Sequence, residues 1–450
     1  PDGINHDVEL DYTGVRATTK TVSIGSTRPG GTVVESQVST EEVRDRQGRT
    51  HQVIERSSSD ETITTTYGYD VTGELSTVQV ESGAASQSRS FSYDGRGFLL
   101  LECQPELGVG GNGCISYNAY DAMGNLLEKT DGDTTYAYTY DRAGRLTEIE
   151  VTRDGVTYPA RQLTYCNAVG LPAECTQQSL GKLLRAVSHN HYNPATPAAS
   201  LPITETYEYN GIGGAVSKRT TEFPLLPFGA SIEQHFTWTQ LGNLASMDYP
   251  LLTPTTTQPE QPIGPIRAAT YSYTWGWLSS ASLGGRATSM SYHENGMLSQ
   301  LSHSNGVTDT FGLDTNSMQR PASITVTGPD AGTWTTGTIS YDGAGNITTM
   351  GDDWFLYDGL SRLTQAHLAD INNNSISDSV DLAYRYDPFG NRTDTFWSTT
   401  DEQGGLSSSW YRLSVDPATN RLQSETYDSS GNMTSLLGDQ LAWYPFNQLR

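Results

Sequence analysis

The chain has 450 residues, more than one compact hydrophobic core usually holds, so several domains or an array of repeats are expected. Its formal net charge of -24 argues against a nucleic-acid-binding protein, because such a surface would repel phosphates. It contains no run of about 18 apolar residues, so no transmembrane helix is predicted.

The composition indicates an ordered protein with little aliphatic core. Hydrophobic residues make up 35% of the chain, and such an acidic, aliphatic-poor composition lies near the range of disordered proteins. However, 25 Tyr and 8 Trp are more than disordered segments usually carry, and 45 Gly favour many turns. A single β layer that is wet on both faces fits these numbers, because it needs less aliphatic content than a solid core.

Residues 1–66 are predicted to form a looser β region with degenerate repeats. They are rich in Thr, Ser and Val, and RDRQGRT at Arg44 is their one plain repeat unit. The opening PDGINHDVEL has neither a basic start nor an apolar stretch, so no signal peptide is expected. Because the chain starts and stops within the repeat pattern, we expect it to be a piece of a longer polypeptide, or a processed one.

From residue 67 to residue 450 a short phrase that begins with Tyr-Asp keeps returning. The clear copies are YDVTGEL at Tyr69, YDGRGFL at Tyr93, YDAMGNL at Tyr120, YDRAGRL at Tyr140, YDGAGNI at Tyr341, YDGLSRL at Tyr357, YDPFGNR at Tyr386 and YDSSGNM at Tyr427. Degraded copies fill most gaps, namely YCNAVGL at Tyr165, YNGIGGAV at Tyr209, WTQLGNL at Trp238, YHENGML at Tyr292, VDPATNRL at Val415 and YPFNQLR at Tyr444. Residues 67–450 are therefore predicted to form one repeat wall.

Each copy predicts one β-hairpin. The approach to the turn alternates, so that Tyr136, Tyr138 and Tyr140 share one face of a strand. The Asp caps the turn by accepting hydrogen bonds from the backbone N–H groups ahead of it. The Gly, for example Gly124 or Gly144, supplies the positive φ that closes a short loop with a bulge. One hairpin is marginally stable alone, and stacked copies stabilise each other.

The four cysteines form two local pairs in the sequence, Cys103 with Cys114 and Cys166 with Cys175. Neither spacing resembles a zinc site, whose ligand pairs stand two to four residues apart. Two short-loop disulfides are predicted, and they imply an oxidising compartment. Four free buried thiols are the alternative.

Two stretches interrupt the repeats after the second cysteine pair. Residues 193–202 and 250–265 are rich in Pro and Thr, and because Pro does not suit a central strand we predict long loops there. The window SLGKLLRAVSHNHY from Ser179 could form a few helical turns but fits a strand equally well. Very little helix is expected in the chain.

The segment DINNNSISDSVD, from Asp370 to Asp381, is the strongest candidate metal site. Its oxygen-bearing residues match alternating positions of an EF-hand-like calcium loop, with the carbonyl of Ile376 at position 7. The candidate ligands are Asp370, Asn372, Asn374, Ile376, Asp378 and Asp381. Ser375 replaces the usual Gly and Asp381 the usual Glu, so a polar hairpin insertion without calcium is the alternative.

No catalytic signature is present in the sequence. The chain has no G-x-S-x-G, H-E-x-x-H, P-loop or C-x-x-C motif. Most Asp residues stand at the capping position of a repeat turn, which explains them without an acid pair for glycoside hydrolysis. His189 and His191 would share one strand face and could bind a metal, but eight His in a chain of this length require no site.

The repeated Tyr-Asp-x-x-Gly-Arg/Asn-Leu phrase, together with YRYDPFGNRTDT and DPATNRLQS, resembles the YD-repeat or RHS (rearrangement hotspot) family, and bacterial members most. The resemblance implies hairpins that spiral into a curved, hollow, shell-like β wall. In bacterial toxin members such a shell encloses a toxic C-terminal polypeptide, and in the animal teneurins a similar barrel is an adhesion scaffold. Toxin shells end in a self-cleaving Asp-Pro-x-Gly-Leu type motif, whereas Asp387-Pro388-Phe389-Gly390 continues with Asn391 and reads as a repeat turn.

These observations lead to one expected function and two alternatives. We expect a non-enzymatic, secreted or cell-surface shell fragment that encapsulates and helps deliver a polypeptide, with the cargo or the rest of a longer parent chain as its partner. The first alternative is an extracellular adhesion scaffold that binds cell-surface carbohydrate or protein. The second is a self-assembling sheath, because an incomplete spiral would leave unpaired sheet edges.

Overall fold

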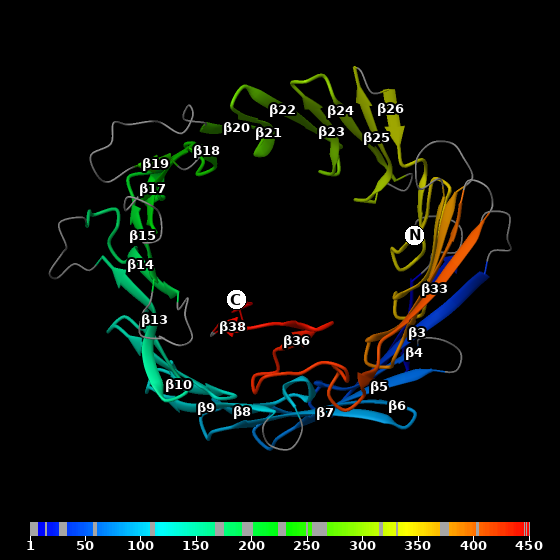
Figure 1. The fold of residues 1–450 in the computed structure, drawn as a ribbon, viewed down its shortest axis with the longest axis horizontal. Coiled ribbons are helices and arrows are strands. Elements are labelled where there is room, and N and C mark those ends of the chain that lie inside the picture. The colour runs from blue at the N-terminus through cyan, green and yellow to red at the C-terminus, as the bar shows by residue number, and fades with distance from the viewer. Residues whose placement is uncertain are drawn as a thin grey trace. The chain divides into compact units, whose positions relative to one another are not determined.

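The structure of the protein is a computed structural model. It describes residues 8–13, 16–26, 34–56, 61–108, 113–166, 175–190, 201–223, 231–248, 251–253, 268–314, 318–329, 332–369, 378–401, 405–444, 446 and 448–449. Within them the chain is built almost entirely of antiparallel β-strands (Figure 1). The predicted all-β class is confirmed.

Strands β1 to β26 belong to one sheet. They are β1 Val8–Thr13, β2 Ala17–Ser26, β3 Val34–Arg44, β4 Thr50–Arg56, β5 Thr62–Tyr69, β6 Leu75–Ser82, β7 Ala85–Tyr93, β8 Leu99–Cys103, β9 Cys114–Tyr120, β10 Leu126–Asp131, β11 Thr134–Tyr140, β12 Leu146–Arg153, β13 Val156–Tyr165, β14 Leu183–Asn190, β15 Leu201–Glu208, β16 Lys218–Glu222, β17 Ser231–Trp238, β18 Leu244–Asp248, β19 Leu251–Thr253, β20 Ala268–Thr274, β21 Trp277–Leu283, β22 Arg286–Tyr292, β23 Leu298–His303, β24 Thr308–Leu313, β25 Pro321–Gly328 and β26 Gly332–Thr335.

The remaining strands form a seven-stranded sheet and three short hairpins. The sheet contains β27 Ile339–Tyr341, β28 Ile347–Met350, β29 Asp353–Tyr357, β30 Leu363–Ala369, β31 Ser379–Tyr386, β32 Arg392–Thr400 and β33 Leu406–Arg412. The hairpins pair β34 Val415–Asp416 with β35 Arg421–Leu422, β36 Ser435–Leu436 with β37 Asp439–Gln440, and β38 Trp443–Tyr444 with β39 Gln448–Leu449.

Each strand generally pairs with its neighbours in the chain, which makes the sheet a succession of hairpins. For example, β12 pairs antiparallel with β11 on one side and with β13 on the other. The register shifts by one residue at the Tyr that begins a repeat, as between Thr139 and Tyr140 or between Ser92 and Tyr93. This shift is the bulge that the Gly-containing turns predict.

Helix is confined, in the residues described above, to two single 3-10 turns, η1 Pro105–Leu107 and η2 Ile212–Gly214. The ambiguous window after Ser179 adopts a strand, β14. It pairs antiparallel with β13 on one side and with β15 on the other, so this segment is part of the sheet. The expectation of very little helix is confirmed, and no helix found in the described residues could span a membrane.

The two predicted loops are partly wrong at their edges. Leu201 and Pro202 begin β15, where Pro202 pairs with His189, and Leu251–Thr253 forms β19 beside β17. Pro202 is tolerated because it stands near the start of its strand, where a missing N–H costs little. Residues 193–200 and 254–265 lie outside the described residues.

Contacts divide the chain into two compact units. Unit 1 comprises Pro1–Ile115, Tyr292–Ser299 and Asp309–Ala442, and unit 2 comprises Ser116–Ser291, Gln300–Thr308 and Trp443–Arg450. Each unit therefore combines repeats from the first part of the chain with residues near its C-terminus. The predicted division at residues 66 and 67 stays a prediction.

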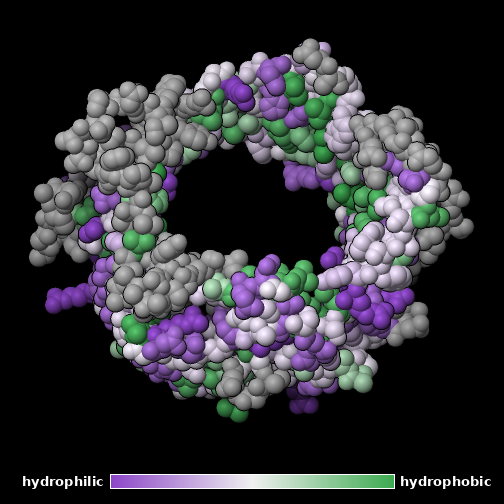
Figure 2. Space-filling view, viewed as in Figure 1, coloured by the Kyte–Doolittle hydropathy of each residue, from purple (hydrophilic) through white to green (hydrophobic). Residues whose placement is uncertain are grey.

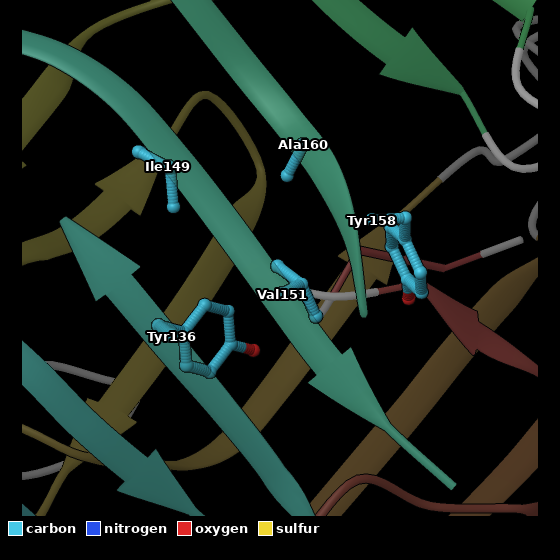
Figure 3. Packing of buried hydrophobic residues seen from close by; sticks show 5 residues of the cluster. All are labelled: Tyr136, Ile149, Val151, Tyr158 and Ala160. Atoms are coloured by element: carbon cyan, nitrogen blue, oxygen red, sulfur yellow. The ribbon is translucent and has the colours of Figure 1, made fainter. Parts of the chain in front are cut away.

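The main buried cluster of unit 2 lies on one face of three neighbouring strands (Figure 3). Tyr136 of β11, Val151 of β12 and Tyr158 of β13 are direct cross-strand partners. Ile149 and Ala160 complete the cluster, and Val151 has no exposed surface. Such contacts between side chains on one face stabilise the sheet directly, so a thick core is not required.

Most other strand residues are half-buried, and polar and apolar side chains intermingle on the molecular surface (Figure 2). Buried polar residues such as Gln87, Thr134 and Thr204 are about as common as buried apolar ones in the described residues. This distribution fits the thin, wet β layer that the composition predicts.

Candidate functional site

The turn of each repeat is held by its Asp. At the Tyr140 copy, Oδ1 of Asp141 accepts hydrogen bonds from the backbone N–H groups of Ala143 (2.8 Å) and Arg145 (3.0 Å). Oδ2 of Asp141 accepts a bond of 2.8 Å from Nε of Arg145. Gly144 donates its N–H to the carbonyl of Asp141 and has a φ of 74°. The predicted capping role and the positive φ of Gly144 and Gly124 are both confirmed.

The same contacts keep these carboxylates ionised. The hydrogen bond from Arg145 is the main cause that lowers the pKa of Asp141, and the side-chain amide of Asn125 lowers the pKa of Asp121 in the same way. A carboxylate with a lowered pKa is a poor general acid near neutral pH. These Asp side chains therefore have the chemistry of structural caps.

The Arg and the Tyr of the phrase join one repeat to the next, a function that sequence reasoning missed. The guanidinium of Arg145 lies 4.4 Å from the ring centroid of Tyr165, which begins the following repeat. Arg49 contacts Tyr69 in the same way at 4.1 Å, within unit 1. Further steps of this kind link Arg320 to Tyr341, and Arg362 to Tyr386.

The Tyr hydroxyl adds a second contact between successive repeats at several of these pairs. In unit 1 it donates to the carbonyl of the residue that follows the Arg, from Tyr69 to Thr50 (2.7 Å) and from Tyr386 to Leu363 (2.8 Å). In unit 2, Tyr209 donates to Leu183 (2.7 Å), where Lys182 replaces the Arg. At these three copies the repeat is therefore bound to its predecessor by both a cation–π contact and a hydrogen bond.

The Tyr hydroxyl also identifies a repeat that the sequence analysis did not find. Tyr273 donates to the carbonyl of Leu244 (3.0 Å), and the register shifts at Tyr273 as at other repeats. Its turn is short, with Trp275 at φ 56° and Gly276 at φ 86° in place of the Asp-capped loop. This copy is not recognisable in the sequence because its turn lacks the capping Asp and is shorter than the turns of the other repeats.

The candidate calcium segment lies mostly outside the described residues, which exclude Asp370, Asn372, Asn374 and Ile376. Asp378 is buried, and Asp381 lies in β31, where Oδ1 is 2.8 Å from Nδ1 of His367 on β30. No group of three metal-ligating side chains occurs among the described residues. Calcium binding therefore stays a prediction.

Of the two candidate metal-binding His residues, only His189 lies among the described residues. His189 on β14 contacts Gln162 at 3.4 Å, and His191 lies outside the described residues. Asp387 of the Asp-Pro-Phe-Gly segment accepts bonds from the backbone of Phe389 and Asn391, so it is a repeat turn as expected.

Both predicted disulfides are present, Cys103–Cys114 and Cys166–Cys175. The described residues contain no free cysteine. Each bond closes a local loop, with separations of 11 and 9 residues in the sequence. The alternative of four free thiols is wrong.

The C-terminal repeats of unit 1 bind to strands from the first quarter of the chain. The side chain of Gln87 on β7 donates to the carbonyl of Pro417 (2.8 Å) and to Oδ1 of Asn420 (2.6 Å). Asn420 donates to Oε1 of Glu106 at 2.7 Å, and Arg421 donates from Nε to the carbonyl of Glu106 at 2.9 Å. We call residues 416–422 the docked turn.

In unit 2 the last described residues bind to the main buried cluster. The ring of Phe446 lies 5.1 Å from that of Tyr136, and its backbone N–H donates to the Tyr136 hydroxyl at 3.1 Å. Arg153 of β12 donates to the carbonyl of Trp443. These contacts join residues about three hundred positions apart, and no local sequence pattern could have indicated them.

The comparisons with known proteins agree with this geometry. The RHS Repeat family model matches residues 120–157, which run from the end of β9 into β13. The fold is similar to the structure of TcdB2-TccC3, with a TM-score of 0.73 and 15% identity over 98% of this chain and 24% of that one. It is also similar to that of TcdB2-TccC3-TEV, with a TM-score of 0.71 and 15% identity over 96% of this chain and 24% of that one.

A third similar structure is "TcdB2-TccC3 without hypervariable C-terminal region", with a TM-score of 0.59 and 17% identity over 92% of this chain and 22% of that one. The chain thus spans about a quarter of the length of the solved chains that it matches. No curated protein matches it in sequence. At such low identity the structural likeness establishes a common fold. The chain therefore contains an RHS repeat at residues 120–157 and shares its fold with these structures.

Proposed function

We propose that the chain is part of a non-enzymatic RHS shell that encapsulates a polypeptide and helps deliver it. The observation that carries this proposal is the fold shared with TcdB2-TccC3 over nearly the whole chain. One of the similar structures is named for the removal of a hypervariable C-terminal region. A variable C-terminal region beside a constant repeat wall is what a shell with exchangeable cargo would have.

The chemistry of the repeats supports a structural role. The carboxylates of the repeat turns are engaged as caps, for example Asp141 by Arg145 and Asp358 by Arg362. The two disulfides support a secreted or cell-surface location, because such bonds persist in oxidising compartments. The partner is then a polypeptide cargo, or the remainder of a longer parent chain.

Protease protection of the natural polypeptide that contains this chain tests the proposal. Under native conditions a protease should leave the enclosed polypeptide intact, and it should degrade it once the wall is unfolded with guanidinium. A cargo digested at the same rate in both conditions would contradict encapsulation. The digestion can be repeated on the native protein during mild acid treatment. This would show whether the protease reaches the enclosed polypeptide when the β wall unfolds.

A second candidate function, an extracellular adhesion scaffold, is favoured by an exposed aromatic surface in unit 2. Trp275 lies in the short turn between β20 and β21 and is 95% exposed, and Trp277, which begins β21, is 51% exposed. The neighbouring turn presents Leu241 at 86% exposure, and no charged residue occurs from Ala268 to Gly285. Exposed Trp side chains are frequent energetic centres of binding surfaces, because they offer large apolar area and one N–H donor.

A glycan array and a binding assay on cells test this second function. The double variant Trp275→Ala, Trp277→Ala should lose binding, while Trp334→Ala, which removes a Trp exposed to 50% on β26, should retain it. Equal binding by all three proteins would rule out the turn as the contact.

Self-assembly into a sheath is the third possibility, and one strand favours it. β33 lies at the end of the seven-stranded sheet, and all seven of its residues are exposed. It carries no charge before Arg412, so it lacks the side chains that commonly protect edge strands from pairing with another chain.

A further inference from the structure

The two disulfides lie in different surroundings. Cys166 has no exposed surface, whereas its partner Cys175 is half-buried. Cys103 and Cys114 are half-buried, and both line an open cavity of about 420 Å³ in unit 1. Ser86 and Gln104 also line this cavity, as does Ala418, which belongs to the docked turn. Because thiol–disulfide exchange requires attack on a sulfur atom, this cavity gives a small thiol a route to the Cys103–Cys114 bond.

The segment between Cys103 and Cys114 is also the one that receives the docked turn. Its 3-10 turn, η1, presents Glu106, whose carbonyl accepts from Arg421 and whose Oε1 accepts from Asn420. The same Oε1 accepts a hydrogen bond of 2.6 Å from Arg89 of β7. Glu106 is therefore positioned by the sheet on one side and binds the C-terminal repeats on the other.

The following turn of the chain contacts the same residue. A Cβ atom on Gly431 would lie 2.9 Å from the carbonyl oxygen of Glu106 and 3.3 Å from the side chain of Leu107. Gly431 therefore permits a close approach that a larger residue would prevent. Two successive C-terminal turns thus depend on the position of η1.

We propose that the Cys103–Cys114 disulfide is a redox-sensitive latch that holds the C-terminal repeats on the wall. While the bond is intact, it ties both ends of the segment that carries η1, so Glu106 stays in place for Asn420 and Arg421. A dithiol reductant supplies two electrons and two protons, breaks the S–S bond to give the thiols of Cys103 and Cys114, and is itself oxidised to a disulfide. The freed segment samples more conformations, and the docked turn loses its acceptors.

This latch concerns contacts within the chain and does not depend on an enclosed cargo. If the chain belongs to a delivered shell, transfer from an oxidising to a reducing compartment would release the C-terminal repeats at the destination. The latch can operate in an adhesion scaffold as well, so its test is separate from the protease-protection test of encapsulation.

Hydrogen–deuterium exchange on the whole chain tests the latch. Reduction with dithiothreitol should speed exchange in residues 414–432 by at least about ten-fold, while strands β11 to β13 keep their protection. The double variant Cys103→Ser, Cys114→Ser should show the same faster exchange without reductant. The matched control Cys166→Ser, Cys175→Ser removes the other disulfide and should leave residues 414–432 as protected as in the parent protein.

Unchanged exchange at residues 414–432 after verified reduction of Cys103–Cys114 would overturn the proposal. The same increase in the Cys166→Ser, Cys175→Ser control would also overturn it, because the effect would then be general. If the Cys103→Ser, Cys114→Ser protein does not fold, alkylation during a dithiothreitol titration of the parent protein decides the matter. Labelling of Cys103 and Cys114 before Cys166 and Cys175, at the concentration that deprotects residues 414–432, is the expected result, and the reverse order contradicts it.

Discussion

At the scale of single residues, Arg145 shows why the repeated phrase contains an Arg. Its Nε closes the cap with Asp141, its guanidinium lies over the ring of Tyr165, and its Nη1 donates to the carbonyl of Gly181 at 2.9 Å. One planar side chain with several donors can make all of these contacts at once, whereas the single ammonium of Lys cannot. The Arg thus stabilises its own turn and the junction to the next repeat.

Replacing this residue tests that double role. Arg145→Lys should lower the free energy of unfolding by about 1–2 kcal/mol, because a hydrogen bond to a charged group and a cation–π contact are both weakened. Arg142→Lys in the same turn is the control, since Arg142 is exposed, and it should have almost no effect. Urea unfolding followed by Tyr and Trp fluorescence measures both variants. Equal stabilities of the two would contradict the role of Arg145.

The glycine of the same turn offers a test of backbone strain. Gly144 has a φ of 74°, and a Cβ there would meet no atom closer than 3.8 Å. Gly144→Val should therefore destabilise unit 2 through its backbone conformation and not through a clash, by about 1–3 kcal/mol. Ala143→Val, at an exposed neighbouring position, is the control. A thermal unfolding midpoint that is the same in both variants would show that the positive φ costs nothing.

The capping Asp residues predict acid sensitivity. Hydrogen bonds at Asp121 and Asp141, chiefly from the side chains of Asn125 and Arg145, lower their pKa from the ordinary value of 3.8. The folded state thus binds these protons less readily than the unfolded state, so stability is fully present above about pH 4 and is lost as the pH falls through the lowered pKa values. Urea midpoints between pH 2 and 7 should be flat near neutrality and fall below about pH 4. Asp141→Asn should flatten this fall, and a stability that rises on acidification would contradict the argument.

At the scale of elements, the hairpin and its link to the next hairpin are the units of structure. The hydroxyl of Tyr386 reaches back to Leu363, and Arg362 donates to the carbonyl of Asp387 in the next turn at 3.0 Å. Burial raises the pKa of Tyr386, as expected for a phenol held within the sheet. The Tyr273 copy retains this link without the Asp cap, so the Tyr contact persists where the cap is lost.

The connection between β30 and β31 carries the calcium prediction. Several carboxylates and amides on one short segment are expected to bind a cation that neutralises their repulsion. Calcium should raise the melting temperature by mass action, and Asp370→Ala should remove most of that rise. Asp381→Asn adds a comparison, because Asp381 already contacts His367 in the folded sheet. If calcium titration produces no heat and a chelator leaves the melting temperature unchanged, the segment is a polar insertion that does not bind calcium.

At the scale of the whole molecule, the accessible surface is the clearest quantity. The chain of 49.0 kDa exposes 26283 Å², whereas a compact protein of that mass exposes about 17,000 Å². Among the described residues, most strand residues are half-buried rather than buried. Stability then comes from cross-strand pairs and links between neighbouring repeats, as in other repeat proteins.

Small-angle scattering tests this description. A compact protein of 450 residues has a radius of gyration of about 22 Å, and a thin β wall should give a clearly larger value. Far-UV circular dichroism on the same sample should report almost no helix. A radius near 22 Å, or a helix content above about a fifth, would contradict a single β layer.

The sequence by itself determined the hairpins, the Asp caps, the Gly turns and both disulfides, because these interactions join residues that are close in the chain. Asp141, Gly144 and Arg145 lie within one turn, and each cysteine pair closes a loop of about ten residues. Sequence reasoning missed the Tyr273 repeat, where the local signal is degraded, and it placed two loops too widely at Pro202 and Leu251.

Only the tertiary structure decided what lies far apart in sequence and close in space. The partner of each Tyr hydroxyl depends on how one hairpin stacks on the next. The binding of Asn420 by Gln87 of β7 and Glu106 of η1 joins the last repeats to residues more than three hundred positions earlier. In a periodic sequence every repeat has the same local pattern, so the pattern does not indicate which distant repeats will be in contact. Those contacts depend on the path of the whole chain.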